Sequence, residues 1–261
     1  MNVGAPANAC QEQDRQAGSR GQDPCPLLEV AGGIWRFDPR RLGQTQTCGV
    51  RFATGLRNTL ALAVEPTTGA LYGAQHGRDQ LYGNWPVLYT EAQGAEKPAE
   101  ELLLLEQGGD YGWPYCYYDP ELRKKVLAPE YGGDGRTVGR CTDARTPALA
   151  FPAHWAPDAL LFYSGTQFPA PYRGGAFVAF HGSWNRAPLP QAGYNVVFVP
   201  FARGKPSGSF TVFADGFAEG RLDPGEAAHR PSGLAQGPDG SLYVSDDKGG
   251  RIYRILFVGS R

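Results

Sequence analysis

The sequence contains little of what membrane-spanning, nucleic-acid-binding or mainly helical proteins require. It has no run of about 18 apolar residues, so it predicts no membrane-spanning helix. Its 25 lysines and arginines are balanced by 26 acidic residues, so it lacks the basic excess with which proteins bind nucleic acids or anionic membranes. The first residues are polar and lack the apolar core of a signal peptide. The presence of only one methionine also argues against a helical bundle.

The five cysteines include no CxxC pair and no cysteine–histidine spacing typical of zinc sites, so they predict no structural zinc. Cys10 and Cys25 enclose one polar, glycine-rich loop, and Cys116 and Cys141 enclose another. Each pair is a candidate disulfide, which favours an oxidising compartment. The alternative is five reduced, partly buried thiols. If the two pairs form, Cys48 is the odd thiol.

Glycine and proline are abundant, with 36 and 22 residues, together more than a fifth of the chain. They predict many turns and little long helix, and the length suffices for a single all-β domain over residues 1–261. A strand–turn–strand pattern recurs, because residues 58–75 align with residues 232–246. Alternation of apolar with small or polar residues indicates strands in both segments.

A third, more diverged unit has predicted strands at residues 159–165, 175–181 and 194–201. At the N-terminus, residues 1–4 resemble the end of a first strand and residues 32–38 resemble the second, so the upstream half of that repeat is missing. Repeats of about 40–50 residues with several short strands are typical of β-propeller blades. The sequence therefore predicts an all-β propeller of about three and a half blades.

Long insertions interrupt these repeats after Gly4, between residues 75 and 100, and between residues 115 and 144. We expect them to be loops on one face of the propeller. Residues 102–106 are the only run in which a helix is expected, and the same run is also compatible with a strand.

Ligands of a propeller bind where loops of successive blades converge on the central channel, so residues that border the inner strands are candidates for binding. Three such loops carry unusual residues: 53–58, the glycine- and aromatic-rich 108–115, and 228–232. Arg57 and Arg230 occupy equivalent positions of two repeats. Together they are suited to one ligand, because a planar guanidinium holds a carboxylate through two parallel hydrogen bonds. The alternative is that each forms a salt bridge between blades or lies solvated in its loop.

The same strings resemble the glucose/sorbosone dehydrogenase family, which are soluble quinoproteins that use pyrroloquinoline quinone. The resemblance rests on Leu-Arg-Asn at 56–58, on Gly-Gly-Asp-Tyr-Gly-Trp-Pro at 108–114, and on Arg230 ahead of Pro-Asp-Gly-Ser-Leu-Tyr-Val at 238–244. The strings at 151–157 and 181–186 resemble the sorbosone dehydrogenase-like branch in particular. The similarity covers nearly the whole chain, and the string at 108–114 is its fairly specific part.

The resemblance implies a six-bladed propeller with the quinone lying flat over its central channel. It implies that Arg57 and Asn58 bind the polar edge of the quinone, where a fixed cation and an amide donor stabilise the charge gained on reduction. Arg230 matches an arginine that holds a cofactor carboxylate. The family has a lysine near the quinone on the strand that here ends at His181, and the nearest cation is Arg186, so both are candidate cofactor contacts.

The resemblance also implies a calcium ion, bound by the backbone carbonyls of Gly112 and Pro114. Calcium prefers oxygen ligands and acts as a Lewis acid on a carbonyl. The implied reaction is oxidation of an aldose or sorbosone-like sugar, with the electrons passed to an external acceptor. The implied location of the full-length protein is periplasmic or secreted.

The sequence departs from the family at the general base. In the family, a histidine that takes the proton of the sugar hydroxyl precedes the strand ending in Asn-Val-Gly. Here Asn2, Val3 and Gly4 follow Met1 directly. We therefore expect an N-terminally truncated chain that has no catalytic base and is inactive in isolation.

Two other functional classes are left open by the sequence. One is a propeller that only binds a protein or polysaccharide. The other is a calcium-dependent lactonase-like hydrolase, which needs acidic and amide side chains converging on a central ion.

Overall fold

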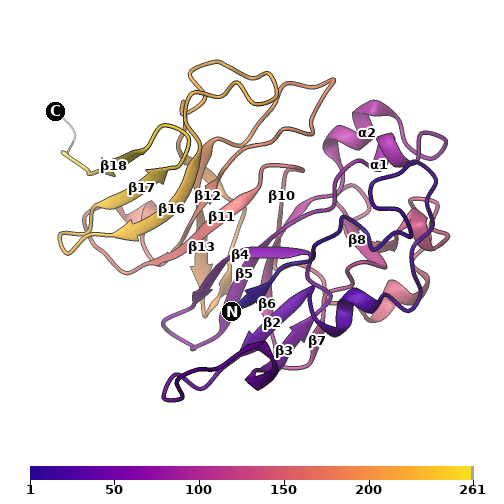
Figure 1. Cartoon of the computed structure of the whole chain (residues 1–261). Coiled ribbons are helices and arrows are strands. Elements are labelled where there is room, and N and C mark those ends of the chain that lie inside the picture. Colours follow the sequence, from indigo (N-terminus) through magenta and orange to yellow (C-terminus); the bar gives the residue numbers. More distant parts are fainter. Residues whose placement is uncertain (260–261) are drawn as a thin grey trace. The chain divides into compact units, whose positions relative to one another are not determined.

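The computed structural model describes residues 1–259, which form two compact units (Figure 1). Unit 1 comprises Met1–Thr59 and Gln75–Ala153, and unit 2 comprises Leu60–Ala74 and the chain from His154 onward. Short strands are the main regular secondary structure of both units, in agreement with the β class predicted from the glycine, proline and alternation patterns. No helix among the described residues has the length and apolar character needed to cross a membrane.

The main sheet of unit 1 has the order β1-β2-β3-β7. Its strands are β1 (Asn2–Val3), β2 (Gly33–Arg36), β3 (Val50–Thr54) and β7 (Gly109–Asp110). Asn2 pairs with Ile34 and Val3 with Gly33 in an antiparallel register, which confirms the strand pair predicted at the N-terminus. β3 and β7 run parallel, and this pairing places the loops that follow them at the same end of the sheet.

The remaining strands of unit 1 are β6 (Glu100–Leu105), which pairs with β10 (Leu149–Phe151), and the hairpin of β8 (Cys116–Asp119) and β9 (Lys124–Leu127). Of the two structures expected for residues 102–106, the strand is therefore the one that forms. The prediction that no other segment is helical was wrong, because α1 (Leu81–Asn84) and α2 (Glu91–Glu96) lie within the insertion at 75–100. A capping box between Thr90 and Gln93 starts α2.

The three insertions pack against each other in unit 1 instead of forming separate loops. One apolar cluster joins the α1 segment to the β8–β9 hairpin, and a second joins the N-terminal insertion to Trp113. The Cys10–Cys25 and Cys116–Cys141 disulfides both form, which confirms the predicted pairing, and Cys48 is an exposed free thiol. The 3₁₀ helices are Pro26–Glu29, Gln46–Cys48, Pro129–Tyr131, Gly139–Asp143 and, in unit 2, Ala170–Tyr172.

Unit 2 contains two antiparallel sheets with a common apolar core. The first has the order β11-β12-β13-β14, with β15 also paired to β13, and the second has the order β16-β17-β18. The strands are β11 (Pro157–Tyr163), β12 (Gly175–Phe180), β13 (Asn195–Ala202), β14 (Lys205–Pro206), β15 (Thr211–Ala214), β16 (Pro231–Gln236), β17 (Leu242–Asp246) and β18 (Arg251–Ile255). All residues of β12 are buried, so this strand forms the centre of the core.

The strands predicted from the repeat pattern are present in both aligned segments. β4 (Asn58–Val64) and β5 (Leu71–His76) are neighbouring strands, and β16 and β17 are their counterparts. The boundary between the two units passes through β4 and β5. The predicted strands at 159–165, 175–181 and 194–201 correspond to β11, β12 and β13.

Candidate functional site

The loop that carries Arg57 and the loop at 108–114 lie together because of the parallel pairing of β3 and β7. The Tyr111 amide donates to the Thr54 carbonyl (3.1 Å), and the Trp113 amide donates to the Gly55 carbonyl (2.9 Å). Gly55 has φ +72°, and a Cβ there would lie 2.1 Å from Asp110 Oδ1. The two strings singled out in the sequence are therefore parts of one tightly packed structure, in which position 55 requires glycine.

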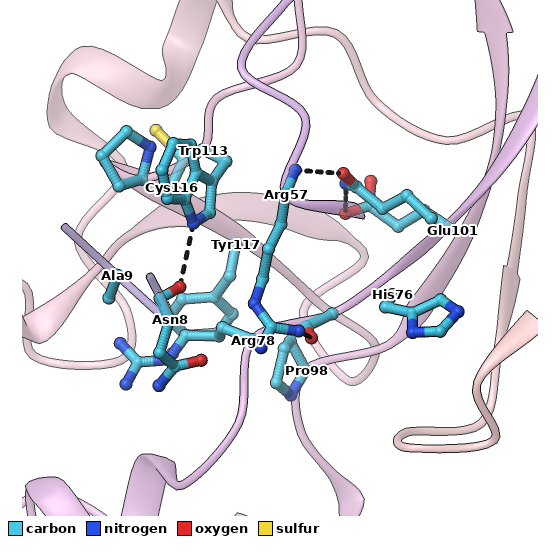
Figure 2. A pocket seen from close by; sticks show the side chains of 13 residues that line it. Asn8, Ala9, Arg57, His76, Arg78, Pro98, Glu101, Trp113, Cys116 and Tyr117 are labelled. Carbon is cyan, nitrogen blue, oxygen red and sulfur yellow. Dashed lines mark hydrogen bonds between the residues drawn. The ribbon is translucent and has the colours of Figure 1, made fainter. Parts of the chain in front are cut away.

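Arg57 is a buried cation whose side chain is held on one edge (Figure 2). Its Nη1 donates to the Gly77 carbonyl (2.7 Å), and its Nη2 contacts Asp79 Oδ2 (2.9 Å). Its backbone amide donates to Gln75 Oε1 (3.0 Å). The Nε atom is buried and has no hydrogen-bond partner among residues 1–259. A buried donor without a partner is rare and marks a place where a further acceptor would be stabilising.

Asp79, which binds Arg57, is itself fixed from two other directions. Arg15 of the N-terminal insertion contacts the same Oδ2 atom at 3.0 Å. Asn8 donates from Nδ2 to the Asp79 carbonyl (3.0 Å) and accepts from the Asp79 amide (2.8 Å). The disulfide-closed insertion thus helps to orient Arg57, although its sequence gave no indication of this role.

Asn58, the other predicted quinone ligand of this loop, lies against the N-terminal strand. A Cβ built on Gly4 would lie 2.1 Å from Asn58 Oδ1 and 3.3 Å from its Cγ. The glycine of the Asn-Val-Gly string therefore leaves room for the Asn58 amide. Asn58 is half-buried and begins β4.

A small cavity of about 20 Å³ adjoins Arg57 in unit 1 (Figure 2). Its walls include Asn8, His76, Pro98, Trp113 and Pro114. The indole Nε1 of Trp113 donates to the Asn8 carbonyl (2.9 Å), which joins the N-terminal insertion to the 108–114 loop. A cavity of this volume has room for about one water molecule, so it belongs to the packing around Arg57 and is not itself a chamber for a cofactor.

Gly112 and Pro114, the predicted calcium ligands, lie in the turn that follows β7. Gly112 has φ +96°, and a Cβ there would lie 2.8 Å from Cys116 Cβ. Its carbonyl already accepts from the Cys116 amide (2.8 Å), which leaves one lone pair for a cation. Residues 1–259 contain no group of three or more histidine, cysteine or acidic residues that could hold a metal. A cation at this turn would therefore depend on backbone carbonyls.

Arg230, in unit 2, is held by the chain around the end of β12. Its Nε donates to the His181 carbonyl (2.9 Å), and its Nη2 donates to the Gly182 carbonyl (2.6 Å). Its guanidinium also lies 5.8 Å from the centroid of the Tyr194 ring. The structure thus brings together two of the predicted cofactor residues, Arg230 and His181, through a backbone contact that the sequence did not suggest.

The backbone of Arg230 is fixed by the buried carboxylate of Asp246. Asp246 Oδ1 accepts from the amides of Arg230 (2.9 Å), Lys248 (3.1 Å) and Gly249 (3.0 Å), and Oδ2 lies 2.6 Å from His229 Nδ1. Burial raises the pKa of this carboxyl, but the hydrogen bonds from the Arg230 and Gly249 amides and from His229 outweigh burial and lower the pKa below its ordinary value. Asp246 is therefore an ionised anchor for the Arg230 loop.

The His181 ring lies between two carboxylates. Its Nε2 is 2.9 and 3.1 Å from the two oxygens of Asp247, and its Nδ1 is 3.9 Å from Asp158 Oδ2. Arg186 donates from Nε to the Pro190 carbonyl (3.3 Å) within its own loop. His181 is thus a polar residue with acidic neighbours on both ring nitrogens.

The predicted residues fall into two sets, one in each unit. Arg57, Asn58, Gly112 and Pro114 belong to unit 1, and His181, Arg186 and Arg230 belong to unit 2. The sequence did not single out Asp79 or Gln75 as partners of Arg57 in the first set, nor Asp246 as the anchor of the second. Only burial and long-range hydrogen bonds identify these residues, so no local sequence signal could have found them.

A second cavity, of about 220 Å³, lies in unit 2 and is lined by none of the residues predicted from the sequence. Its walls include Glu65, Phe162, Phe201 and Arg203. The Glu65 carboxylate accepts from the amides of Thr67 and Thr68 and is thus used within its own turn.

Comparison with known proteins finds a matching family model and several similar sequences. The family described as TrAA12-like matches residues 35–256. The chain is 30% identical over 282 residues to a pyrroloquinoline quinone-dependent pyranose dehydrogenase of Coprinopsis cinerea, covering 91% of this chain and 36% of that protein. It is 26% identical over 225 residues to a pyrroloquinoline quinone-dependent sugar dehydrogenase of Hypocrea jecorina, covering 78% of this chain and 48% of that protein.

The fold is similar to that of a solved structure from Coprinopsis cinerea. The holo form of the pyranose dehydrogenase PQQ domain from Coprinopsis cinerea superposes with a TM-score of 0.75 at 24% identity, over 98% of this chain and 66% of that one. The chain spans less than half of the length of the two curated relatives named above. Because the family match extends over most of the sequence, the chain belongs to the TrAA12-like family.

Proposed function

We propose that this chain supplies cofactor-binding residues of a pyrroloquinoline quinone-dependent sugar dehydrogenase. The family match and the names of the relatives support this proposal. The observation that carries it is the state of Arg57, a buried guanidinium held on one edge by Gly77 and Asp79 while its Nε has no partner among the described residues. A fixed cation with an unused donor suits an anionic or polar ligand.

The cofactor residues of the proposal are Arg57, Asn58, His181, Arg186 and Arg230. Arg57 would supply a fixed positive charge, and Asn58 would supply an amide beside it. Arg230 donates from Nε and Nη2 to the carbonyls of His181 and Gly182. Its Nη1 donates no hydrogen bond to any group in the part of the chain that the structure describes. That atom is the donor with which Arg230 would hold a carboxylate.

Each unit by itself offers hydrogen-bond donors that suit the quinone, whose carboxylates and ring oxygens are hydrogen-bond acceptors. When bound, the quinone supplies the capacity to accept two electrons and a proton equivalent from a sugar. The residues of this chain orient it and stabilise negative charge on its polar edge. We further propose that the carbonyls of Gly112 and Pro114 hold calcium, because calcium prefers oxygen ligands and this turn offers backbone carbonyl oxygens.

The finer assignments follow the resemblance. We propose an aldose or sorbosone-like sugar as substrate, an external electron acceptor, and a propeller architecture to which this chain contributes about three and a half blades. The two disulfides support a periplasmic or secreted location. The lactonase-like alternative would require acidic and amide side chains converging on one ion.

The experiment that tests the proposal is a titration of the purified chain with the quinone in the presence of calcium, followed by absorbance and by the change in melting temperature. Binding is the readout, because the proposal concerns the cofactor residues of this chain. We expect Arg57→Met to weaken binding by at least about tenfold, equivalent to about 1.4 kcal/mol. Arg140→Met is the control, since Arg140 of the same unit pairs with Asp23 (2.7 Å) and contacts neither Asp79 nor Arg57. A wild-type chain that does not bind the quinone, or an Arg57→Met variant that binds it normally, would contradict the proposal.

A further inference from the structure

Three fully buried polar side chains form a continuous chain of contacts in unit 1. Gln75, Glu101 and Lys125 are 4%, 3% and 2% exposed. Gln75 Nε2 donates to Glu101 Oε1 (3.1 Å), and Lys125 Nζ lies 2.9 Å from Oε1 and 2.7 Å from Oε2 of Glu101. The three residues come from β5, β6 and β9, which are distant from one another in the sequence.

The two ends of this polar chain hold the two loops of the candidate site. At one end, Gln75 Oε1 accepts the backbone amide of Arg57 (3.0 Å). At the other end, Lys125 Nζ donates to the Tyr111 carbonyl (2.9 Å), directly before the Gly112 turn. One buried ion pair thus connects the backbone at Arg57 to the backbone of the proposed cation-binding turn.

The Lys125 ammonium makes two hydrogen bonds in this buried position. It donates to Glu101 Oε1 and to the Tyr111 carbonyl, and Glu101 Oε2 lies 2.7 Å away as an ion-pair contact without a hydrogen bond. Buried ion pairs often add little net stability compared with apolar residues of the same size. Stability alone is therefore a weak explanation for this pair, and a geometric role explains it better.

We propose that Gln75, Glu101 and Lys125 are positioning residues for the cofactor site. They hold the Arg57 backbone in place and disfavour a cation at the Tyr111 carbonyl, because the positive Lys125 ammonium lies there, whereas the Gly112 carbonyl accepts only from the neutral Cys116 amide. The inference rests on the proposed function. None of the three residues is proposed to touch the cofactor.

A second buried ion pair of unit 1 provides the control. Lys97 is 6% exposed and contacts Asp119 Oδ2 at 2.8 Å and Glu121 Oε2 at 2.7 Å. Its ammonium makes no contact with Arg57 or with the 108–114 loop. Lys97→Met and Lys125→Met therefore make the same chemical change in similarly buried pairs, and only the second interrupts the proposed positioning chain.

The experiment measures two properties of the wild type, Lys125→Met, Lys97→Met and the double variant Glu101→Gln/Lys125→Met. The first is amide hydrogen exchange of the peptide at 108–116 without any ligand. The second is the affinity for the quinone with calcium. The double variant removes both charges and thus leaves no unpaired carboxylate, so it separates loss of stability from loss of position.

We expect Lys125→Met and the double variant to exchange the 108–116 amides at least about tenfold faster. We also expect both to bind the quinone with calcium about 10- to 100-fold more weakly, as is typical when a supporting partner of a ligand is removed. Lys97→Met should change neither property beyond its effect on overall stability. Equal exchange and equal affinity in Lys125→Met and Lys97→Met would overturn the inference while leaving the proposed function intact. If the wild type binds no quinone, the proposed function fails, and the exchange measurement still decides the positioning role.

Discussion

Replacing Asp246 by asparagine removes the charge on which the Arg230 loop depends. The carboxylate accepts three backbone amides and contacts His229 at 2.6 Å, with its side chain fully buried. Asparagine keeps one oxygen for the amides, but neutral hydrogen bonds are weaker than charge-assisted ones by about 1 kcal/mol each. Over the three amide hydrogen bonds, we expect a loss of about 3 kcal/mol in the free energy of unfolding at pH 7.

Thermal unfolding measures this loss. With an unfolding entropy of about 2.1 cal/mol/K per residue, 3 kcal/mol corresponds to a fall of about 5 °C in Tm if the whole chain unfolds together, and about twice that if unit 2 unfolds separately. The matched control is Asp247→Asn, which removes the neighbouring carboxylate, whose side chain is 57% exposed. Exposed ion pairs contribute about 0–1 kcal/mol, so the control should lower Tm by at most about 2 °C if the whole chain unfolds together and about 4 °C if unit 2 unfolds separately.

The lowered pKa of Asp246 also predicts how the free energy of unfolding depends on pH. The pKa of Asp246 is lowered in the folded chain, so the carboxylate stabilises the fold at pH values above the unfolded pKa of about 4. That contribution is lost as the pH falls through the folded pKa. The difference in stability between wild type and Asp246→Asn should therefore be full at pH 7 and shrink below about pH 4. Equal Tm values at pH 7, or a difference that does not change with pH, would refute the assigned role of Asp246.

Two further predictions concern local structure in unit 1. Gly55→Ala should destabilise the chain by more than about 2 kcal/mol in denaturant unfolding, because it combines a positive φ with a Cβ 2.1 Å from Asp110 Oδ1. Gly69→Ala, at φ +74° in open space, should cost only about 1 kcal/mol, and equal costs would contradict this explanation. Removing the Cys116–Cys141 disulfide by a double serine substitution should cost about 3.5 kcal/mol by loop-closure entropy for its 25-residue separation. An unchanged unfolding midpoint would show that the reduced 115–144 loop is already constrained.

The strands were predictable because their signals are local. Alternating side chains and turns rich in proline and glycine identify β4, β5, β16 and β17 from short stretches of sequence. The helices α1 and α2 were missed because each is shorter than two turns and is stabilised by tertiary packing instead of by its own periodicity. α1 packs against the β8–β9 hairpin, and Gly94 of α2 lies against Tyr82 of α1.

The candidate site was only partly predictable. The arginines and the glycine-rich turn were visible as residue types in a recurring position. Their partners were not visible. Asp79, Glu101, Lys125 and Asp246 are charged residue types that mostly lie on protein surfaces, so the sequence alone does not distinguish them from solvated residues. The contact between Arg230 and the His181 carbonyl joins residues 49 positions apart, and no pattern within one strand encodes it.

The sequence alone was sufficient to identify the strand-rich class, the cysteine pairs and the strings from which the cofactor residues are proposed, because each of these depends on neighbouring residues or on simple spacing. The tertiary structure decided which backbone groups these residues contact. The parallel register of β3 and β7 places the loops after Thr54 and Asp110 side by side, and the buried Glu101–Lys125 pair joins them. Both features arise from long-range pairing and from the exclusion of water, which act only once the chain has folded.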